Sequence, residues 1–463
     1  MVRHAELVEL VLPDFGYPSF EPKIPAEVYI DRLERLRKKS KPYTHILVYG
    51  DREHSANIQH LTGYDPRFEE ALLIVDIHED QQWIMVGNEG NGYLEACPIK
   101  ENLNPVLYQP FSLLAQSRDR SRPLKQILQD TGITANSVIG VAGWKYYTPQ
   151  ESPDPHHWIE APSYLVDNLR ALATDVTNAT HLLMHQTEGL RAVNEPEQLA
   201  VMEYASTLTS QAVRDIIYNI KPGMTEHQAF QLAQLNGYPQ SVHPMLSSGE
   251  RAWIGLPSPT DKKIQRGEAF TTAIGLQGAL TCRAGWLLDH EMQLPKKIKD
   301  YIEKLAAPYF EAAIAWLETL SIGVTGGELY KAVHDRIGDP FYGVTLNPGH
   351  LIGMDEWINS PIYEGSQDRI KPGMALQTDI IPATGTPYFT INIEDGVAIA
   401  DQHTRNRLMQ DYPEAWDRIT NRRDYMTEQL GIRLQPETLP FSNLASHLPP
   451  FILNPGRAFK MTG

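Results

Sequence analysis

Cysteine is scarce in this sequence, and long apolar runs are missing. The 463 residues include two cysteines, Cys97 and Cys282, so disulfides are not expected to hold the fold together. No stretch reaches the roughly 18 consecutive apolar residues of a membrane span. The opening residues lack the charged-then-apolar pattern of a signal peptide. These absences favour a cytoplasmic protein without a membrane partner.

Positive charge is also in short supply. The formal net charge is −16 at pH 7, and the richest Lys/Arg run, residues 35–41, has the character of a solvated helix end. A nucleic-acid partner is therefore not expected. The hydrophobic fraction of 42% and aromatic fraction of 9% indicate a folded globular chain, and its length suggests two domains.

The first 185 residues alternate helix-like and strand-like segments. The spacing of Val28, Leu33 and Leu36 predicts an amphipathic helix over residues 26–39. Short apolar, β-branched runs predict buried strands at residues 45–49, 71–75 and 138–142. This order is typical of an α/β layer domain, which we place at residues 1–185.

A second domain is predicted for residues 186–425. Pro196 suits the first turn of a helix, and an apolar face then continues for several turns until Lys221-Pro222-Gly223. The remaining residues, 426–463, form a predicted C-terminal tail. This tail could cover the site, pack across a dimer or be loosely ordered.

A short motif that occurs twice indicates that the second domain consists of two related halves. Residues 220–226, Ile-Lys-Pro-Gly-Met-Thr-Glu, are mirrored by residues 322–328, Ile-Gly-Val-Thr-Gly-Gly-Glu. Each segment follows a predicted long helix and opens another. A threonine at a helix start is common by itself, but the matched context on both sides favours two related halves.

Three polar residues stand in apolar, strand-like surroundings near the end of this domain. They are His350, Asp379 and Glu394. A histidine and two carboxylates in such runs are what a buried site with convergent polar groups requires. The upstream region that would complete such a site is apolar.

These residues and their neighbours resemble the "pita-bread" hydrolases, the family of aminopeptidase P, prolidase, methionine aminopeptidase and creatinase. The resemblance covers residues 26–401 and rests on motifs in a fixed order: Asn57-Ile58-x-x-Leu61-Thr62-Gly63-Tyr64, Leu190-Arg191-x-Val193-x-x-Pro196, residues 220–226, Gly349-His350-x-x-Gly353, Pro372-Gly373-Met374 and Ile393-Glu394-Asp395. It implies an α/β N-terminal domain plus an α+β pita-bread C-terminal domain of the creatinase/methionine aminopeptidase type. It also implies a homodimer.

The metallopeptidases of this family hold two metal ions with two aspartates, one histidine and two glutamates. By resemblance, His350 matches the histidine, Asp379 takes the place of the first glutamate and Glu394 matches the last glutamate. Alignment puts Ala273 at the first aspartate, and counting by the family spacing puts Ala284 at the second, with Arg283 beside it. Alanine binds no metal, so a dinuclear centre is not expected.

Two further histidines of the family are also replaced. The histidine that serves as acid/base in creatinase falls on Leu256, and a second peptidase histidine falls near Trp357. Neither family mechanism therefore transfers intact. No cofactor is expected, although His350, Asp379 and Glu394 could together hold a single divalent ion.

Several roles remain open for the three residues. His350 could be a general acid/base or a structural histidine. Asp379 and Glu394 could share a proton and act as acid and base, or Arg283 could neutralise them.

Other residues are candidates for binding substrate. Trp253, Trp286 and Trp357 could form an aromatic cage for a flat or cationic ligand, or simply pack. Arg67 could clamp a substrate carboxylate across a dimer. Arg283, next to Ala284, is a further candidate for binding substrate.

The sequence predicts a hydrolase related to the X-Pro peptidases and creatinase. We expect it to cleave a C–N bond of a small amide, peptide or guanidine-like molecule through His350, Asp379 and Glu394. The alternative is a catalytically inactive relative that binds a peptide or small ligand in the pocket that corresponds to the family's active site.

Overall fold

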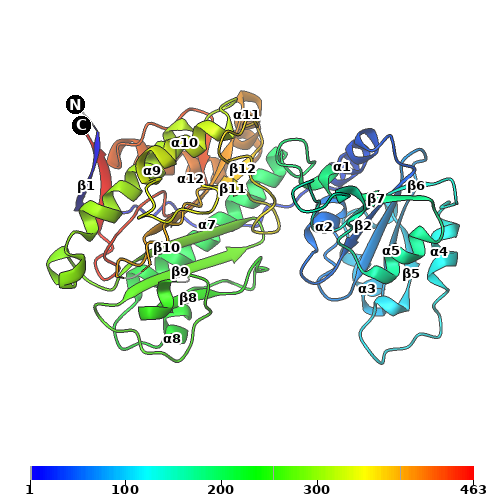
Figure 1. Ribbon diagram of the computed structural model, residues 1–463, viewed down its shortest axis with the longest axis horizontal. Helices are drawn as coiled ribbons and strands as arrows, with labels where there is room; N and C mark the ends of the chain where they lie inside the picture. The colour runs from blue at the N-terminus through cyan, green and yellow to red at the C-terminus, as the bar shows by residue number, and fades with distance from the viewer. Residues whose placement is uncertain (1–2, 254, 386) are drawn as a thin grey trace. The chain divides into compact units, whose positions relative to one another are not determined.

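The computed structural model describes residues 3–253, 255–385 and 387–463 (Figure 1). The chain forms two compact units. The smaller unit is Ile24–Ala192, and the larger unit combines Met1–Lys23 with Val193–Gly463. The boundary thus falls at 192/193, where the sequence suggested 185/186. Residues 1–23, predicted as part of the first domain, belong to the larger unit.

The smaller unit is an α/β layer built on a six-stranded sheet in the order β5-β4-β3-β2-β6-β7. Strands β2 and β3 pair antiparallel, as do β3 and β4, and the other neighbours are parallel. The strands are β2 (His45–Gly50), β3 (Ala71–Asp76), β4 (Gln82–Val86), β5 (Asn104–Leu107), β6 (Val138–Ala142) and β7 (Asp175–Asn178). The helices are α1 (Ala26–Lys39), α2 (Ala56–Thr62), α3 (Asn88–Tyr93), α4 (Leu124–Asp130), α5 (Ser163–Arg170) and α6 (His181–Met184).

The apolar patterns in the sequence account for these elements. Helix α1 covers residues 26–39 as predicted and buries Leu33 and Leu36. Every residue of β2 is buried, and Leu47 and Leu72 belong to a core that continues into α4 and α5. The predicted α/β class is confirmed.

The larger unit contains two four-stranded sheets in the orders β13-β10-β9-β8 and β11-β12-β14-β15, and a two-stranded sheet of β1 and β16. Its strands are β1 (His4–Glu9), β8 (Met245–Ser248), β9 (Ala269–Leu276), β10 (Ala279–Trp286), β11 (His350–Leu351), β12 (Ala375–Gln377), β13 (Asn392–Glu394), β14 (Gly396–Ile399), β15 (Thr438–Pro440) and β16 (Arg457–Thr462). Its helices are α7 (Pro196–Asn219), α8 (Glu226–Phe230), α9 (Ala307–Thr319), α10 (Gly326–Ile337), α11 (Gln402–Asp411) and α12 (Pro413–Asp424). Helix α7 packs against β9 and β10, and α9 packs against α10.

The repeated motif at residues 220–226 and 322–328 lies in two halves that have the same local structure. In the first half, residues 196–286, Thr225 caps α8 through a capping box, and Gly223 donates a backbone hydrogen bond to Ile264. In the second half, residues 307–399, Thr325 caps α10 in the same way, and Gly323 donates to Ile370. A threonine side chain that accepts from the third helical N–H stabilises a helix start. The repeated sequence motif therefore builds the same helix entry twice.

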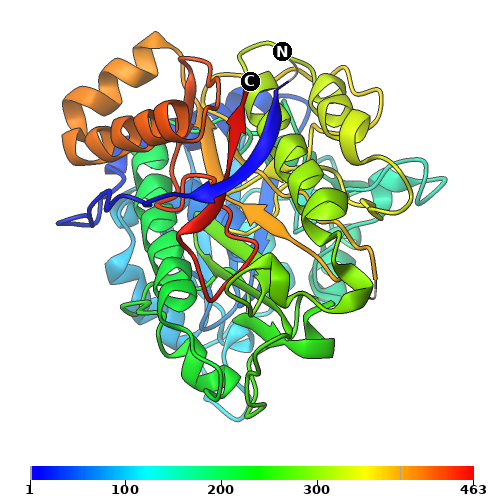
Figure 2. The same cartoon turned by 90° about the vertical axis from the view of Figure 1, so that its left-hand side faces the viewer.

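The C-terminal residues are integral to the larger unit. Strand β15 pairs with β14, and β16 pairs antiparallel with β1. Figure 2 shows β1 and β16 side by side, with the two chain ends together. Residues 438–452 are buried, so of the three alternatives for the tail, loose order does not fit the structure. No helix in the described part of the chain combines the length and apolar character that a membrane crossing demands.

Candidate active site

His350 opens the short strand β11 and is completely buried. The preceding Gly349 has φ +107°, and a Cβ there would lie 2.8 Å from the carbonyl oxygen of Gln377, so the close strand approach requires glycine. The Nδ1 atom of His350 lies 3.1 Å from the carbonyl oxygen of Leu351. Since a carbonyl only accepts, Nδ1 carries a proton, and Nε2 of the neutral ring is free to bind something else.

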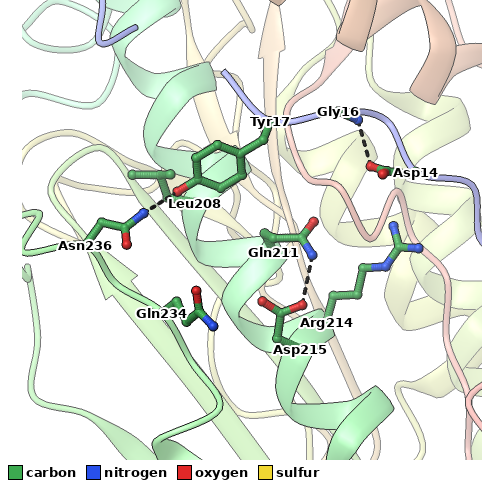
Figure 3. Close-up of a pocket in the computed structure, with 9 residues that line it drawn as sticks. All are labelled: Asp14, Gly16, Tyr17, Leu208, Gln211, Arg214, Asp215, Gln234 and Asn236. Atoms are coloured by element: carbon green, nitrogen blue, oxygen red, sulfur yellow. Dashed lines mark hydrogen bonds between the residues drawn. The ribbon is translucent and has the colours of Figure 1, made fainter. Parts of the chain in front are cut away.

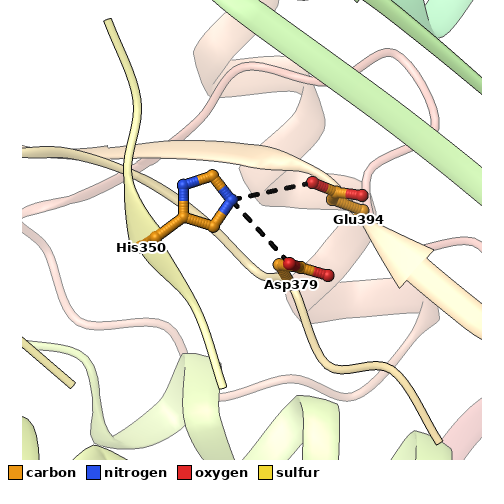
Figure 4. Close-up of side chains that lie close together, drawn as sticks. All are labelled: His350, Asp379 and Glu394. Atoms are coloured by element: carbon orange, nitrogen blue, oxygen red, sulfur yellow. Dashed lines mark ion pairs between the residues drawn. The ribbon is translucent and has the colours of Figure 1, made fainter. Parts of the chain in front are cut away.

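Two carboxylates lie around that nitrogen. Asp379 follows β12, and Glu394 is the last residue of β13. Nε2 of His350 is 3.9 Å from Oδ2 of Asp379 and 3.9 Å from Oε1 of Glu394 (Figure 4). Ligand atoms of the three residues all lie within 4.8 Å of one another. Residues far apart in sequence are thus brought together as predicted.

A third carboxylate, that of Glu356, reaches the same histidine. Its Oε1 atom lies 3.2 Å from Nε2 of His350, and its side chain is 23% exposed. The sequence motifs do not predict Glu356 as a site residue. Its one signal in the sequence is its place next to Trp357, in the segment where the resemblance expects a histidine.

The indole of Trp357 covers one face of the histidine ring. The two ring centroids are 4.0 Å apart, with 18° between the planes. Trp357 is half-buried. The aromatic ring therefore takes the place next to His350 that the resemblance assigns to a second histidine.

Burial and like charge act on these groups together. Burial raises the pKa of Asp379 to about 6. Burial, and then the charge of Asp379, raises the pKa of Glu394 well above its usual range. Burial by itself lowers the pKa of His350, but Glu356 and Glu394 outweigh it and raise that pKa to about 10. The site is therefore a buried, excess-negative cluster at neutral pH.

Some polar atoms of this cluster lack hydrogen-bond partners. Among the described residues, buried side-chain atoms without a hydrogen bond include Nε2 of His350 and Oδ1 of Asp379. A buried polar atom without a partner costs free energy. Such atoms at one point indicate a place where a ligand, a proton or an ion completes the site.

Arg283 serves a different carboxylate from the one suggested. Its Nη2 atom lies 2.7 Å from Oδ2 of Asp395, its Nη1 lies 3.1 Å from Oδ1, and its side chain has no exposed area. Its Nε donates to the carbonyl of His447. Because this guanidinium is enclosed and fully engaged, neither neutralisation of Asp379 and Glu394 nor direct substrate binding by Arg283 fits the structure.

The strand register of the first half bears on which residues stand at the two positions where the resemblance expects aspartates. Cys282 lies opposite both Ala273 and Glu394, whereas Ala284 lies opposite Thr271 and Asn392. The residue in line with Ala273 and the site is therefore Cys282, and not Ala284 as counting suggested. Burial raises the pKa of Cys282, with Glu394 and Asp379 adding to the effect, so its thiol stays protonated.

The other predicted residues lie in varied settings. Trp253 and Leu256 are exposed, and Nε2 of His243 lies 2.8 Å from the carbonyl oxygen of Leu256. Trp286 is buried against Tyr301 and Phe389 and does not line a rim. Arg67 is half-buried in the smaller unit, and its role across a dimer stays a prediction.

A separate polar pocket of about 440 Å³ lies between the N-terminal segment and α7 in the larger unit (Figure 3). Its groups largely satisfy one another. Asn236 donates to the hydroxyl of Tyr17 at 2.8 Å, and Gln211 donates to Asp215 at 2.9 Å. Arg214 donates to the carbonyl oxygens of Leu12 and Pro13. This pocket therefore gives no indication of a specific ligand.

Comparison with known proteins identifies the domain that carries the cluster. Residues 200–401 match the model of metallopeptidase family M24. These residues form an M24 domain. The predicted family is confirmed for these residues, and so is the pita-bread fold of the domain they form.

Curated relatives of the M24 domain are peptidases that have not been characterised. One, from Schizosaccharomyces pombe, is 25% identical over 46% of this chain and 48% of its own length. Another, from Bacillus subtilis, is 24% identical over 47% of this chain and 62% of its own length. The matches thus span about half to three fifths of these relatives.

Solved structures share the fold. An Xaa-Pro dipeptidase from Bacillus anthracis superposes with a TM-score of 0.61 at 15% identity, covering 81% of this chain and 96% of that chain. A prolidase from Pyrococcus horikoshii gives a TM-score of 0.61 at 14% identity, covering 80% and 95%. Escherichia coli aminopeptidase P gives 0.56 at 14% identity, covering 82% and 93%. At these identities the likeness establishes the architecture around the M24 domain.

Proposed function

We propose that the M24 domain hydrolyses a C–N bond of a small amide, peptide or guanidine-like substrate without a dinuclear metal centre. The observation that carries this proposal is the buried meeting of His350, Asp379 and Glu394, with Nε2 of His350 and Oδ1 of Asp379 left without hydrogen bonds. Purely structural use would leave that desolvation cost uncompensated.

The donor set argues against two ions. In the row that extends from Glu394 across the sheet, the side chains are Cys282, Ala273 and Met245. None of them is a carboxylate, and the thiol is held protonated. A dinuclear centre needs several hard ligands for each ion, and this row does not supply them.

The same donors do fit one divalent ion. The proton on Nδ1 of His350 leaves Nε2 available as a lone-pair donor, and the two carboxylates supply anionic oxygens beside it. When bound, an ion there would polarise the scissile carbonyl and lower the pKa of a water molecule. His350, Asp379 and Glu394 would hold it.

The chain's own groups can also manage protons. A carboxyl group whose pKa is near 6, as for Asp379, exchanges its proton readily near neutral pH. Glu394, whose pKa is raised further by burial, is suited to hold a proton and deliver it to a leaving nitrogen. Trp357, stacked on His350, excludes water from one face of the site. We assign it and the exposed Trp253 to substrate contact.

The alternative is an inactive relative that binds a peptide or small ligand in the same pocket. Ala273, Leu256 and Trp357 stand where the resemblance expects an aspartate and two histidines, which favours loss of the family chemistry. A binder would need the shape of the pocket more than its acid/base groups. Substitution of His350 therefore separates the two functions.

The first experiment measures metal content and hydrolysis together. Protein purified without chelators is analysed for bound metal, then loaded with manganese, iron, cobalt or zinc and assayed on X-Pro dipeptides and small amides. We expect no more than one ion per chain. We also expect turnover that falls about 10²- to 10⁴-fold in His350→Ala, the usual contribution of an acid/base group.

Three outcomes would count against this proposal in different ways. Two tightly held ions per chain would overturn the donor analysis. Turnover that survives His350→Ala would remove His350 from the mechanism. Ligand binding without turnover, little changed in His350→Ala, would establish the inactive relative.

A further inference from the structure

Glu356 lies at the tip of a tightly closed loop that follows His350. The amide of Leu351 donates to the carbonyl of Asn359 at 2.8 Å, and the amide of Ile358 donates back to Leu351 at 3.1 Å. The hydroxyl of Ser360 binds the carbonyl of Gly349 at 2.7 Å. These bonds pin both ends of the loop to β11, so the position of Glu356 beside His350 is built into the fold.

Three carboxylates converge on one nitrogen. Around Nε2 of His350, the oxygen of Glu356 is at 3.2 Å, and those of Asp379 and Glu394 are at 3.9 Å. Although the first distance is short, Nε2 makes no hydrogen bond of acceptable geometry, and Oδ1 of Asp379 also has no partner. The groups face one another without satisfying one another, which is the arrangement of ligands around an ion.

Charge balance favours the same conclusion. With its three carboxyl groups ionised and His350 neutral, which is the form that binds a cation, the site carries three negative charges, although His350 is fully buried and Asp379 and Glu394 are nearly so. Several like charges in such a site are costly unless protons or a cation compensate them. A divalent cation would offset two of the three.

We propose that Glu356 is a fourth donor of a mononuclear divalent-cation site formed with His350, Asp379 and Glu394. This inference rests on the proposed function, in which these three residues hold no more than one ion. Three carboxylates and one imidazole form a predominantly hard ligand set, which suits Mn²⁺. Glu356 supplies the charge that Ala273 and Cys282 do not.

Glu356 is also the member of the set that reaches solvent. Its side chain is 23% exposed, whereas that of His350 has no exposed area. An ion would therefore meet Glu356 before the buried donors. Trp357 covers one face of His350, and Glu356 is the donor with the most exposed side chain.

The test is a Mn²⁺ titration of the full-length, chelator-treated protein, with free Mn²⁺ followed by its electron paramagnetic resonance signal. We expect about one Mn²⁺ per chain in the wild type. Glu356→Gln keeps the shape of the side chain but removes its charge, and should weaken Mn²⁺ binding at least about tenfold. Glu356→Asp should fall between the two.

Glu364→Gln is the matched control. Glu364 is an exposed carboxylate in the segment that follows the Glu356 loop, and its substitution removes the same charge without touching His350. Its Mn²⁺ affinity should equal that of the wild type. Thermal unfolding of each apo variant checks folding, and if Glu356→Gln has no folded transition, the Glu356→Asp affinity decides.

The outcomes separate this inference from the proposed function. Equal Mn²⁺ affinity in Glu356→Gln and the wild type would overturn the role of Glu356 while leaving a three-residue site intact. A wild type that binds no Mn²⁺ would overturn the cation site as a whole. Hydrolysis assayed on the same samples without metal reports separately on the proposed function.

Discussion

The two halves of the larger unit share their construction and differ in their chemistry. Thr225 and Thr325 cap equivalent helices, and each half returns its chain through the same pair of backbone hydrogen bonds. Yet the first half presents Met245, Ala273 and Cys282 to the centre, and the second presents His350, Asp379 and Glu394. Backbone architecture and site chemistry are therefore set by separate residues, and one can be lost without the other.

The largest loss of stability should follow from breaking the buried ion pair that joins the two halves. Arg283 of β10 and Asp395, next to Glu394, form a buried ion pair that also includes the hydroxyl of Ser442 at 2.6 Å. Arg283→Met leaves Asp395 buried without its counter-charge, so we expect a loss of about 3–5 kcal/mol in the free energy of unfolding, measured by urea denaturation.

A surface pair gives the control for this prediction. Arg266, whose side chain is half exposed, pairs with Asp289, and Arg266→Met should cost less than about 1 kcal/mol. Similar costs for the two variants would mean that burial does not distinguish these pairs.

A carboxylate added to the first half should make that half contribute to the site, as the second half does. Ala273 is buried opposite Cys282, so Ala273→Asp must either bury a charge or protonate it. Protonating an aspartate at pH 7 costs about 4 kcal/mol. We expect this loss in the metal-free protein and partial recovery with added Mn²⁺, measured by thermal unfolding.

Ala273→Asn adds nearly the same volume without a charge. It should lose stability from crowding, and Mn²⁺ should stabilise it only as much as it stabilises the wild type. A response to Mn²⁺ as large as that of Ala273→Asp would show that the new carboxylate does not reach the ion.

Two buried histidines in the second half and the C-terminal segment should respond to pH in opposite ways. Carboxylates raise the pKa of His350, whereas burial lowers the pKa of His447 to about 4, with Arg283 adding to the effect. His447 accepts from Tyr425 at Nδ1, and its Nε2 lies 2.7 Å from the carbonyl oxygen of Pro455. The neutral ring is therefore fully satisfied.

The sign for His447 follows from proton uptake on unfolding. Between pH 6.5 and about 4, the unfolded chain binds a proton at this residue and the folded chain does not, so stability falls as the pH is lowered through that window. The full effect is about 3 kcal/mol. The difference between the wild type and His447→Gln, measured by denaturation from pH 7 to pH 4, isolates it. A difference that does not change with pH would contradict the prediction.

The helix entries should give the smallest and most similar effects. Thr225→Ala and Thr325→Ala each remove the side-chain acceptor for the N–H of Gln228 and Glu328, respectively. Each should cost about 1 kcal/mol, and the double variant should cost the sum because the sites are independent. Costs that differ severalfold would show that the two halves are not equivalent in energy.

Much of the fold followed from local patterns. The helix at residues 26–39 and the strands near His45, Ala71 and Val138 depend on apolar spacing that is visible in the sequence. The family motifs located His350, Asp379 and Glu394, whose side chains converge in the structure. The homodimer and the role of Arg67 stay predictions.

The errors share one cause. Counting along the chain placed Ala284 beside the site, but the two-residue turn of Gln277 and Gly278 sets the register and puts Cys282 there. The sequence does not tell which carboxylate Arg283 binds. Asp379, Glu394 and Asp395 all belong to the motifs of the second half, and the sequence does not show which of them the arginine side chain reaches. Residues 426–463 were separated as a tail because their pairing with β14 and β1 involves strands distant in sequence.

The sequence alone determined what two positions cannot supply: alanine at position 273 and leucine at position 256 bind no metal and move no proton in any conformation. Only the tertiary structure decided which polar groups meet. Strand register and loop closure brought Glu356 to His350 and gave Arg283 to Asp395. Side-chain chemistry is a property of each residue, whereas a distance between residues is a property of the packed chain.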